Sequence, residues 1–226
     1  MTGEIHPLAH SQCYIDAIAW AAELHHRQQR KGKSVPYLSH LMAVSALIWE
    51  DGGDEDQAIA GLLHDAIEDA GITEGQITAR FGRRVGQIVA DCTDTSGAVA
   101  AGGEKEPWLL RKTRYIASLE EKSETSLLVT AADKAHNARD LLLDSRSDPD
   151  GWERFTAGLE GSAWYLLRVQ QALSHRLPEC RSTALLAEAV QELLSSEPYR
   201  RLVPHGIAPA VWAASYLERP EAHPQP

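Results

Sequence analysis

Aromatic residues, cysteines and long apolar runs are all scarce in this sequence. Aromatic side chains make up 6% of the 226 residues. The three cysteines, Cys13, Cys92 and Cys180, lie far apart in the sequence, so neither a disulfide framework nor a thiolate metal cage is indicated. Because no stretch of about 18 apolar residues occurs and the first residues lack the pattern of a signal peptide, we expect a cytoplasmic protein without a membrane-spanning helix.

Positive charge is also in short supply. Lys and Arg number 22 against 32 Asp and Glu, which gives a formal net charge of −10. General binding to nucleic acid or to an anionic membrane needs an extensive basic face, so we expect neither partner. A ligand that carries phosphate groups would need a local basic pocket.

The residues that are abundant favour helix. Ala, Leu, Glu, Gln and Arg dominate, and 43% of the residues are hydrophobic, which predicts an all-α fold with one substantial core. Residues 1–178 form the expected main domain. Residues 179–226 form a C-terminal extension that either belongs to the same compact unit or is loosely attached, and that could make the contacts of a homo-oligomer.

Apolar periodicity and capping residues predict where the helices lie. Ser39 and Asp54 are the expected N-caps of two successive helices, and Thr73 with Gln76 forms an expected capping box. The expected helical ranges are about 11–29, 39–50, 54–69, 73–81, 83–92, 125–144, 151–176, 182–195 and 209–217, with a further helix that starts near Pro107.

The most informative segment places four ionisable residues inside an apolar run. His64 and Asp65 are adjacent, and Glu68 and Asp69 follow one helical turn later. Side chains four residues apart share a face of a helix, so one imidazole and three carboxylates would lie close together beside the core. Such a cluster is costly without a cation, and the segment therefore predicts a divalent metal site.

Two further polar residues interrupt apolar positions and are candidates to complete this site. His40 lies at the start of the expected 39–50 helix, and Asp133 lies in a strongly apolar run. Imidazole and carboxylate ligands suit Mn2+, Fe2+ or Zn2+ better than Mg2+. His136, on the same apolar helix as Asp133, is expected to hydrogen-bond within the core rather than to bind metal.

Short motifs surround all of these residues. They are His25-x-x-Gln28-x-Arg30-Lys31-Gly32, Pro36-Tyr37-x-x-His40, Leu63-His64-Asp65-x-x-Glu68-Asp69, Phe81-Gly82 and Ala132-Asp133-Lys-x-His136-Asn137-x-Arg139. Together they resemble the hydrolase domain of RelA/SpoT-type proteins, within the HD superfamily of metal-dependent phosphohydrolases. The resemblance covers roughly residues 10–175 and is to single-domain bacterial small alarmone hydrolases above all.

The resemblance implies an enzyme and assigns roles to its residues. The implied reaction is hydrolysis of the 3′-pyrophosphate of a nucleotide alarmone such as ppGpp, the signal of the stringent response, with release of pyrophosphate. Glu68 and Asp69 become the catalytic acidic pair that orients or deprotonates water. The implied metal is Mn2+, with Fe2+ or Zn2+ as alternatives, and its implied ligands are His40, His64, Asp65 and Asp133.

A small-molecule nucleotide is therefore the expected partner, and its base stays open. The resemblance implies contacts from five residues: Arg30, Lys31, Arg111, Lys112 and Asn137. One alternative is an HD phosphatase of another phosphorylated nucleotide, such as an adenosine alarmone, reduced NADP or a nucleoside monophosphate. A second is a catalytically idle regulator that binds a nucleotide, although such a module is expected to have lost a ligand or the acidic pair.

Overall fold

The computed structural model describes residues 10–94, 106–148, 152 and 155–219. Within these ranges the chain is helical, and extended pairing is limited to one isolated bridge between Gln29 and Pro36. The predicted all-α fold is confirmed. The elements are α1 (Gln12–Leu24), α2 (Leu38–Glu50), α3 (Glu55–Leu63), α4 (Ala66–Ala70), α5 (Glu74–Phe81), α6 (Arg83–Cys92), α7 (Trp108–Ser118), α8 (Glu124–Ser147), α9 (Gly158–Arg176), α10 (Arg181–Ser195), α11 (Glu197–Arg200), α12 (Pro209–Ala214) and the 3-10 helix η2 (Ser215–Glu218).

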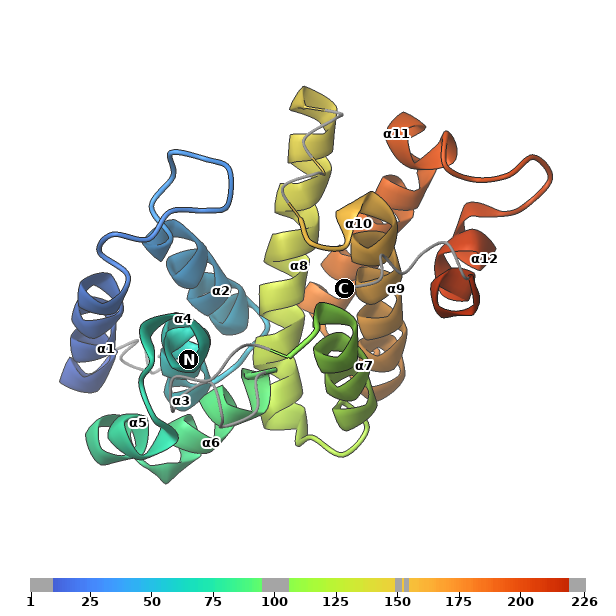
Figure 1. Cartoon of the computed structure of the whole chain (residues 1–226). Coiled ribbons are helices and arrows are strands. Elements are labelled where there is room, and N and C mark those ends of the chain that lie inside the picture. The colour runs from blue at the N-terminus through green and yellow to red at the C-terminus, as the bar shows by residue number, and fades with distance from the viewer. Residues whose placement is uncertain (1–9, 95–105, 149–151, 153–154, 220–226) are drawn as a thin grey trace, which may run out of the picture.

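The long helix α8 lies between α1–α6 on one side and α7 with α9–α12 on the other (Figure 1). It packs into a hydrophobic cluster on each side. Val129 and Ala132 of α8 pack into a cluster with residues of α1 to α6. Other α8 residues, among them Leu127 and Ala135, pack into a second cluster with residues of α7 and α9 to α12. A helix covered on both sides carries apolar residues around much of its circumference, which accounts for the strongly apolar sequence of α8.

The predicted N-cap at Asp54 and the predicted capping box of Thr73 and Gln76 are both confirmed, and Asp54 also forms a capping box. The Asp54 side chain accepts a hydrogen bond from the backbone N–H of Gln57, and the Gln57 side chain accepts one from the backbone N–H of Asp54. Thr73 and Gln76 make the same exchange at the start of α5. These bonds satisfy N–H groups that have no partner within the helix.

Two predicted boundaries were wrong. The first helix ends at Leu24 instead of continuing to residue 29, because His25, with φ −105° and ψ 18°, leaves helical geometry. Ser39 does not cap α2: its hydroxyl donates to the carbonyl of Pro36, and Tyr37 takes the N-cap position without a side-chain bond.

The helix predicted to run through residues 62–69 is also interrupted. It divides into α3 and α4, with His64 and Asp65 in the turn between them. Asp65, with φ −100° and ψ 2°, lies outside the helical region. Helix α4 then ends after one further turn at Gly71, which adopts a left-handed conformation with φ +67°.

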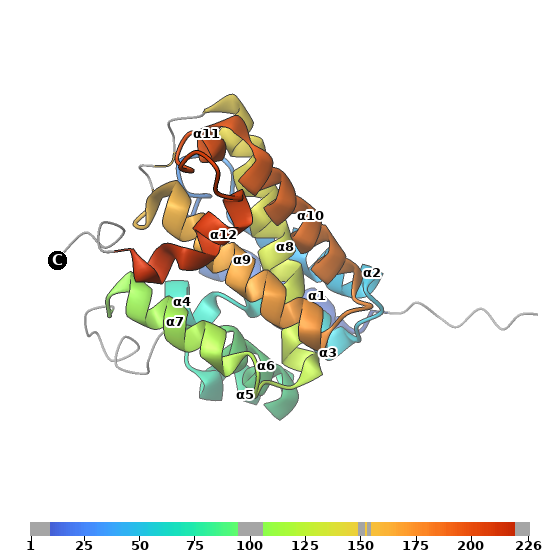
Figure 2. The same ribbon diagram turned by 90° about the vertical axis from the view of Figure 1, so that its right-hand side faces the viewer.

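The C-terminal helices pack onto α8 and α9. Helix α10 lies alongside α8 in both ribbon views (Figure 2). The segment that follows returns to α9, where the rings of Tyr216 and Trp164 stack with their centres 5.6 Å apart. Arg219 pairs with Glu160 of α9 at 2.5 Å.

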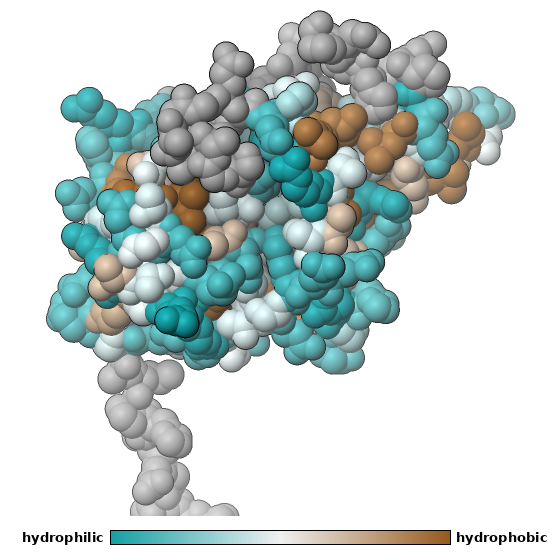
Figure 3. Space-filling view, turned by 60° about the horizontal axis from the view of Figure 1, so that its bottom comes forward, coloured by the Kyte–Doolittle hydropathy of each residue, from teal (hydrophilic) through white to brown (hydrophobic). Residues whose placement is uncertain are grey.

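The face of the molecule seen in Figure 3 is largely hydrophilic where the described residues form it. Figure 3 shows one face on which hydrophobic residues form small separate patches. Among the described residues, none of the helices combines the length and the apolar character needed to span a bilayer.

Candidate metal centre and adjoining cavities

Three ligand-type side chains meet beside α2 and the turn between α3 and α4. His40 lies in the first turn of α2, while His64 and Asp65 form the turn itself. One donor atom from each residue lies within 4.8 Å of the other two. Asp65 Oδ2 is 2.9 Å from His64 Nε2 and 3.9 Å from His40 Nε2. The interruption of the expected helix thus occurs at the residues that form the cluster.

Asp133 approaches the same point from α8. Its Oδ1 lies 3.3 Å from His40 Nε2 and 3.5 Å from His64 Nε2. The Asp133 carboxylate is held by Lys134, whose Nζ donates to Oδ2, and by Asn137, whose Nδ2 lies 2.5 Å from Oδ1. The structure therefore brings together all four residues that the sequence predicts as metal ligands.

Both imidazoles are oriented through their Nδ1 atoms. His64 Nδ1 lies 2.9 Å from the carbonyl oxygen of Gly61, so Nδ1 carries a proton and Nε2 is the nitrogen that faces the cluster. His40 Nδ1 lies 2.9 Å from His136 Nδ1. Burial and the neighbouring His40 lower the pKa of His136 to about 4, so His136 is neutral and can accept the proton of His40 Nδ1.

This arrangement leaves two buried nitrogens without hydrogen-bond partners. Nε2 of His40 and Nε2 of His64 are both buried; carboxylate oxygens of Asp65 and Asp133 lie 2.9 to 3.9 Å from them, but among the described residues neither nitrogen has a partner with the geometry of a hydrogen bond. Buried polar atoms are normally satisfied. Imidazoles that bind metal commonly donate their other N–H to a carbonyl or a similar acceptor, and both histidines follow that pattern.

The electrostatics of the cluster favour a positive charge. Burial disfavours a protonated His64, but the Asp65 and Asp133 carboxylates outweigh it and raise the pKa of His64 well above its usual value. Burial lowers the pKa of His40. Two carboxylates beside buried imidazoles create a negative potential that a divalent cation would neutralise.

The donor set fits a first-row divalent cation. Two imidazole nitrogens and two carboxylates form a mixed nitrogen and oxygen set of the kind that Mn2+, Fe2+ and Zn2+ accept. The carboxylates are also oriented from outside, because Tyr37 donates its hydroxyl proton to Asp65 Oδ2 and Lys134 donates to Asp133 Oδ2. Such outer contacts are typical of metal centres.

Glu68 and Asp69 have different surroundings. Glu68 Oε1 accepts a hydrogen bond from the backbone N–H of Asp94 at 2.8 Å. Burial, together with the carboxylates of Asp94 and Asp65, raises the pKa of Glu68 to about 7. Asp69 is exposed, and its Oδ2 accepts a hydrogen bond from Gln28 Nε2 at 2.7 Å. Of this predicted acidic pair, Glu68 is the member that lines the cavities beside the cluster.

Arg111 and Lys112 both bind Asp94, whose backbone N–H donates to Glu68. Arg111 donates to Asp94 Oδ1, and Lys112 Nζ lies 2.5 Å from Asp94 Oδ2. The Asp94 side chain is only 4% exposed. Glu68 on α4, Asp94 just after α6, and Arg111 and Lys112 on α7 therefore form one connected network.

Arg30 and Lys31, the other two predicted cationic contacts, lie near the half of α8 that carries Asn137 and Asp140. Arg30 Nη2 is 2.8 Å from Asp140 Oδ2 and 2.9 Å from Asn137 Oδ1. Lys31 Nζ lies 5.4 Å from the centre of the Phe155 ring. Asn137 is thus bonded to both Arg30 and Asp133, and it links the predicted substrate contacts to the metal cluster.

Two cavities adjoin the cluster. The inner cavity, of about 170 Å3, is lined by Asp65, Glu68 and Asp133 among others. The outer cavity, of about 420 Å3, is lined by Arg30, Lys31 and Arg111 among others. The residues that line both are Tyr37, Glu68, Lys112, Lys134, Asn137 and Tyr165.

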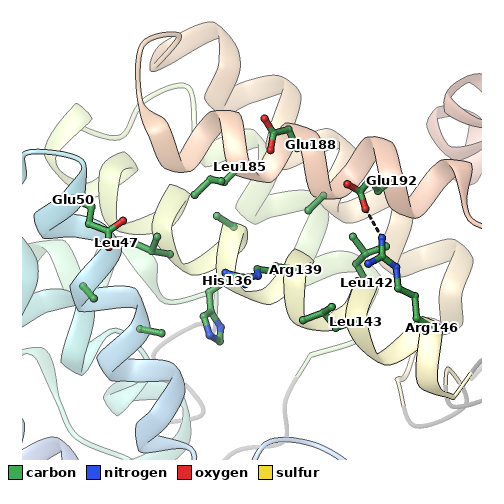
Figure 4. A pocket seen from close by; sticks show the side chains of 14 residues that line it. Leu47, Glu50, His136, Arg139, Leu142, Leu143, Arg146, Leu185, Glu188 and Glu192 are labelled. Carbon is green, nitrogen blue, oxygen red and sulfur yellow. Dashed lines mark hydrogen bonds and ion pairs between the residues drawn. The ribbon is translucent and has the colours of Figure 1, made fainter.

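A third cavity, of about 600 Å3, lies between α2, α8 and α10 (Figure 4). It is lined by apolar residues such as Leu47 and Leu185 and by charged residues that include the ion pair of Arg146 and Glu192, 2.5 Å apart. His136 is the lining residue that also contacts the metal cluster. None of the residues predicted to act on substrate or metal lines this cavity.

Sequence reasoning missed several residues of the site. Lys134 follows Asp133 directly, and Tyr37 lies inside a motif, so position was a usable signal for both. Asp94 and Tyr165 come from distant segments, and no local pattern marks them.

The chain belongs to the HD domain family, whose model matches residues 17–150. That range includes the four residues of the metal-type cluster: His40, His64, Asp65 and Asp133.

Comparison with curated proteins finds relatives with more specific names than the family model gives. The chain is 35% identical over 141 residues to guanosine-3′,5′-bis(diphosphate) 3′-pyrophosphohydrolase MESH1 of Xenopus tropicalis, which covers 61% of this chain and 73% of that protein. It is 32% identical, over the same shares, to MESH1 of Homo sapiens. A probable guanosine-3′,5′-bis(diphosphate) 3′-pyrophosphohydrolase of Synechocystis is 34% identical over 125 residues, 55% of this chain and 16% of that protein.

Solved structures share the fold. A structure described as a metazoan ortholog of SpoT that hydrolyzes ppGpp matches with a TM-score of 0.65 and 24% identity, over 83% of this chain and 96% of that one. A Listeria monocytogenes structure matches with a TM-score of 0.62 and 24% identity, over 70% of this chain and 99% of that one.

Proposed function

We propose that this protein is a metal-dependent phosphohydrolase that removes the 3′-diphosphate of a guanosine alarmone such as guanosine 3′,5′-bis(diphosphate). The products are pyrophosphate and a nucleotide with a free 3′-hydroxyl. The relatives whose names state this reaction support the substrate class. The observation that carries the proposal is the inner cavity, where Glu68, with its pKa raised to about 7, faces the same space as Asp65 and Asp133.

The residues proposed to hold the metal are His40, His64, Asp65 and Asp133, which supply two imidazole nitrogens and two carboxylates. When bound there, a divalent cation lowers the pKa of a coordinated water and polarises a phosphoryl oxygen. We propose Mn2+ as the native ion, with Fe2+ and Zn2+ as the alternatives that the same donors accept.

The chain's own residues then account for the remaining steps. Glu68 takes a proton from the attacking water, which a carboxylate with a pKa near 7 does efficiently at neutral pH. The water oxygen bonds to the phosphorus attached to the 3′-oxygen, that phosphorus–oxygen bond breaks, and the 3′-oxygen is protonated. Arg111, Lys112, Arg30 and Lys31 supply positive charge around the outer cavity, where it stabilises the developing phosphoryl charge.

Asp69 takes an indirect part in this proposal. It is exposed and holds Gln28, which belongs to the segment that leads to Arg30 and Lys31. Asn137, bonded to both Arg30 and Asp133, is proposed to align the substrate contacts with the metal and to contact the substrate.

If the substrate were instead an adenosine alarmone, reduced NADP or a nucleoside monophosphate, the metal chemistry would be the same. The contacts that each substrate makes in the outer cavity would differ. We also propose a cytoplasmic site of action.

A substrate panel tests the proposal. The protein is stripped of metal with a chelator, reloaded with Mn2+, Fe2+ or Zn2+, and assayed with guanosine and adenosine 3′-pyrophosphates, reduced NADP and nucleoside monophosphates. We expect pyrophosphate release from a guanosine 3′-pyrophosphate that depends on added metal. Absence of phosphate or pyrophosphate release from every member would overturn the assignment as a hydrolase.

A further inference from the structure

Tyr165, on α9, presents a buried hydroxyl that the mechanism above does not use. The residue is 8% exposed and lines both the inner and the outer cavity. Its hydroxyl has no hydrogen-bond partner among the described residues. Because an unsatisfied buried hydroxyl costs free energy, an acceptor on a bound ligand would stabilise this group, and the described residues supply none.

Two ammonium groups lie close to the same ring. Lys112 Nζ is 4.7 Å and Lys134 Nζ is 5.9 Å from the centre of the Tyr165 ring. Lys112 bonds to Asp94 and Lys134 bonds to Asp133. An ammonium group has three N–H donors. Each lysine therefore has donors left for a further acceptor after its bond to Asp94 or Asp133.

These donors adjoin the metal-type cluster. Lys134 holds Asp133, whose Oδ1 lies within 3.5 Å of both imidazole nitrogens. An acceptor bound by Tyr165 and the lysines would therefore lie next to the phosphorus that reacts. A diphosphate has a second phosphoryl group at that position, and its oxygens accept several charge-assisted hydrogen bonds at once.

We propose that Tyr165, Lys112 and Lys134 bind the outer phosphoryl group of the substrate's 3′-diphosphate, with the Tyr165 hydroxyl donating to one of its oxygens. This assignment rests on the proposed function, because it requires a substrate with a diphosphate. The same contacts bind inorganic pyrophosphate, which serves as a probe without any need for turnover.

A purely structural role for Tyr165 predicts something different. Its ring meets Trp108 edge-on, with centres 6.2 Å apart, and phenylalanine would preserve that packing. Tyr115 offers a matched control, because it lines the inner cavity and is 4% exposed, whereas its hydroxyl is bonded to Thr130 Oγ1 at 3.2 Å.

The experiment compares Tyr165→Phe and Tyr115→Phe with the wild type. Pyrophosphate is titrated into each protein by calorimetry, with and without Mn2+, and the protein-bound metal is measured after each titration. We expect Y165F to bind pyrophosphate roughly tenfold or more weakly, since a hydrogen bond to a charged group is lost, at an unchanged metal content and thermal midpoint. Y115F should show the converse, with a lower midpoint and unchanged pyrophosphate affinity.

The outcomes separate this inference from the proposed function. Equal pyrophosphate affinity of Y165F and the wild type overturns the inference, even if the wild type hydrolyses a guanosine 3′-pyrophosphate. Tight binding lost in Y165F, without hydrolysis of any 3′-pyrophosphate by the wild type, supports the anion contact and overturns the proposed function. Should Y165F fold poorly, Lys112→Met takes its place in the same titration, and unchanged affinity there contradicts the proposal as well.

Discussion

At the scale of single residues, Glu68 is the group on which the proposed chemistry depends. It lies three positions after Asp65, lines both cavities beside the metal-type cluster, and is tied to the backbone of Asp94 at 2.8 Å. Its partial burial distinguishes it from Asp69, which is exposed and bonded to Gln28. The two acidic residues therefore should respond differently to the same substitution.

Glu68→Gln should lower kcat by about 10²- to 10⁴-fold, the usual contribution of a general base, while protein-bound metal is retained. Asp69→Asn is the matched control, with the same loss of charge one residue away, and should lower kcat/KM much less because its carboxylate contacts Gln28 and not the cavity. Steady-state kinetics and metal analysis of both variants test this. Equal losses in the two variants would show that the acidic residues act as a pair.

The pH dependence of the reaction follows from the pKa of Glu68. Burial first, and then the carboxylates of Asp94 and Asp65, raise that pKa to about 7. The base form is the ionised one, so kcat/KM should rise with pH up to about 7 and then level off. Substitution E68Q should remove this inflection from the residual activity, and a profile with the same inflection in E68Q would assign it to another group.

The sequence predicted the centre of the site better than its surroundings. His40, His64, Asp65 and Asp133 were candidates because ligand-type residues stood out among apolar ones, and the family resemblance then implied them as one ligand set. The surrounding contacts, such as the hydrogen bond from the Asp94 backbone N–H to Glu68, join segments that only the folded chain brings together. A single sequence carries no signal for them.

At the scale of elements, the short α4 helix positions Glu68. The N-cap at Asp54 and the capping box at Thr73, which need only residues at most three positions apart, were predicted correctly. The turn at His64 and Asp65 was missed, because the apolar period continues through it and tertiary contacts of these side chains decide the local geometry. Gly71 then ends α4 with φ +67°.

Gly71→Ala tests how much this terminus contributes. A Cβ at Gly71 would meet no atom within 4 Å, so the cost is that of the left-handed backbone alone, and we expect unfolding free energy to fall by about 1 kcal/mol. Gly75→Ala is the control: this glycine lies within α5 without a positive φ, and its Cβ would meet only Thr73 Oγ1 at 3.9 Å. Alanine there should leave stability unchanged or slightly higher. Denaturant unfolding compares the two, and equal stability of G71A and wild type would contradict the assignment of a strained terminus.

At the scale of the whole molecule, α8 joins two halves that contribute different parts of the site. The proposed metal ligands come from the α1–α6 side and from α8 itself, whereas Lys112 and Tyr165 come from α7 and α9 on the other side. The inner cavity lies where both sets meet. Metal and substrate phosphate would therefore be held by different halves of the molecule, with Asp133 and Lys134 adjacent on the shared helix.

Metal removal should accordingly weaken the whole fold as well as activity. A ligand that binds only the folded state stabilises it by about 2.7 kcal/mol at a hundredfold excess over its Kd, which for a domain of this size corresponds to a thermal midpoint roughly 5 to 10 °C higher. We expect chelation to lower the wild-type midpoint and added Mn2+ to restore it, because the cation neutralises the buried carboxylates of Asp65 and Asp133. In His64→Ala, which lacks one of the two unpartnered imidazole nitrogens, the midpoint should not respond to chelator or Mn2+. Scanning calorimetry of both proteins measures these midpoints, and metal analysis shows whether the wild type carried metal before chelation. If it did, and chelation leaves its midpoint unchanged, the ion does not link α2, the α3–α4 turn and α8.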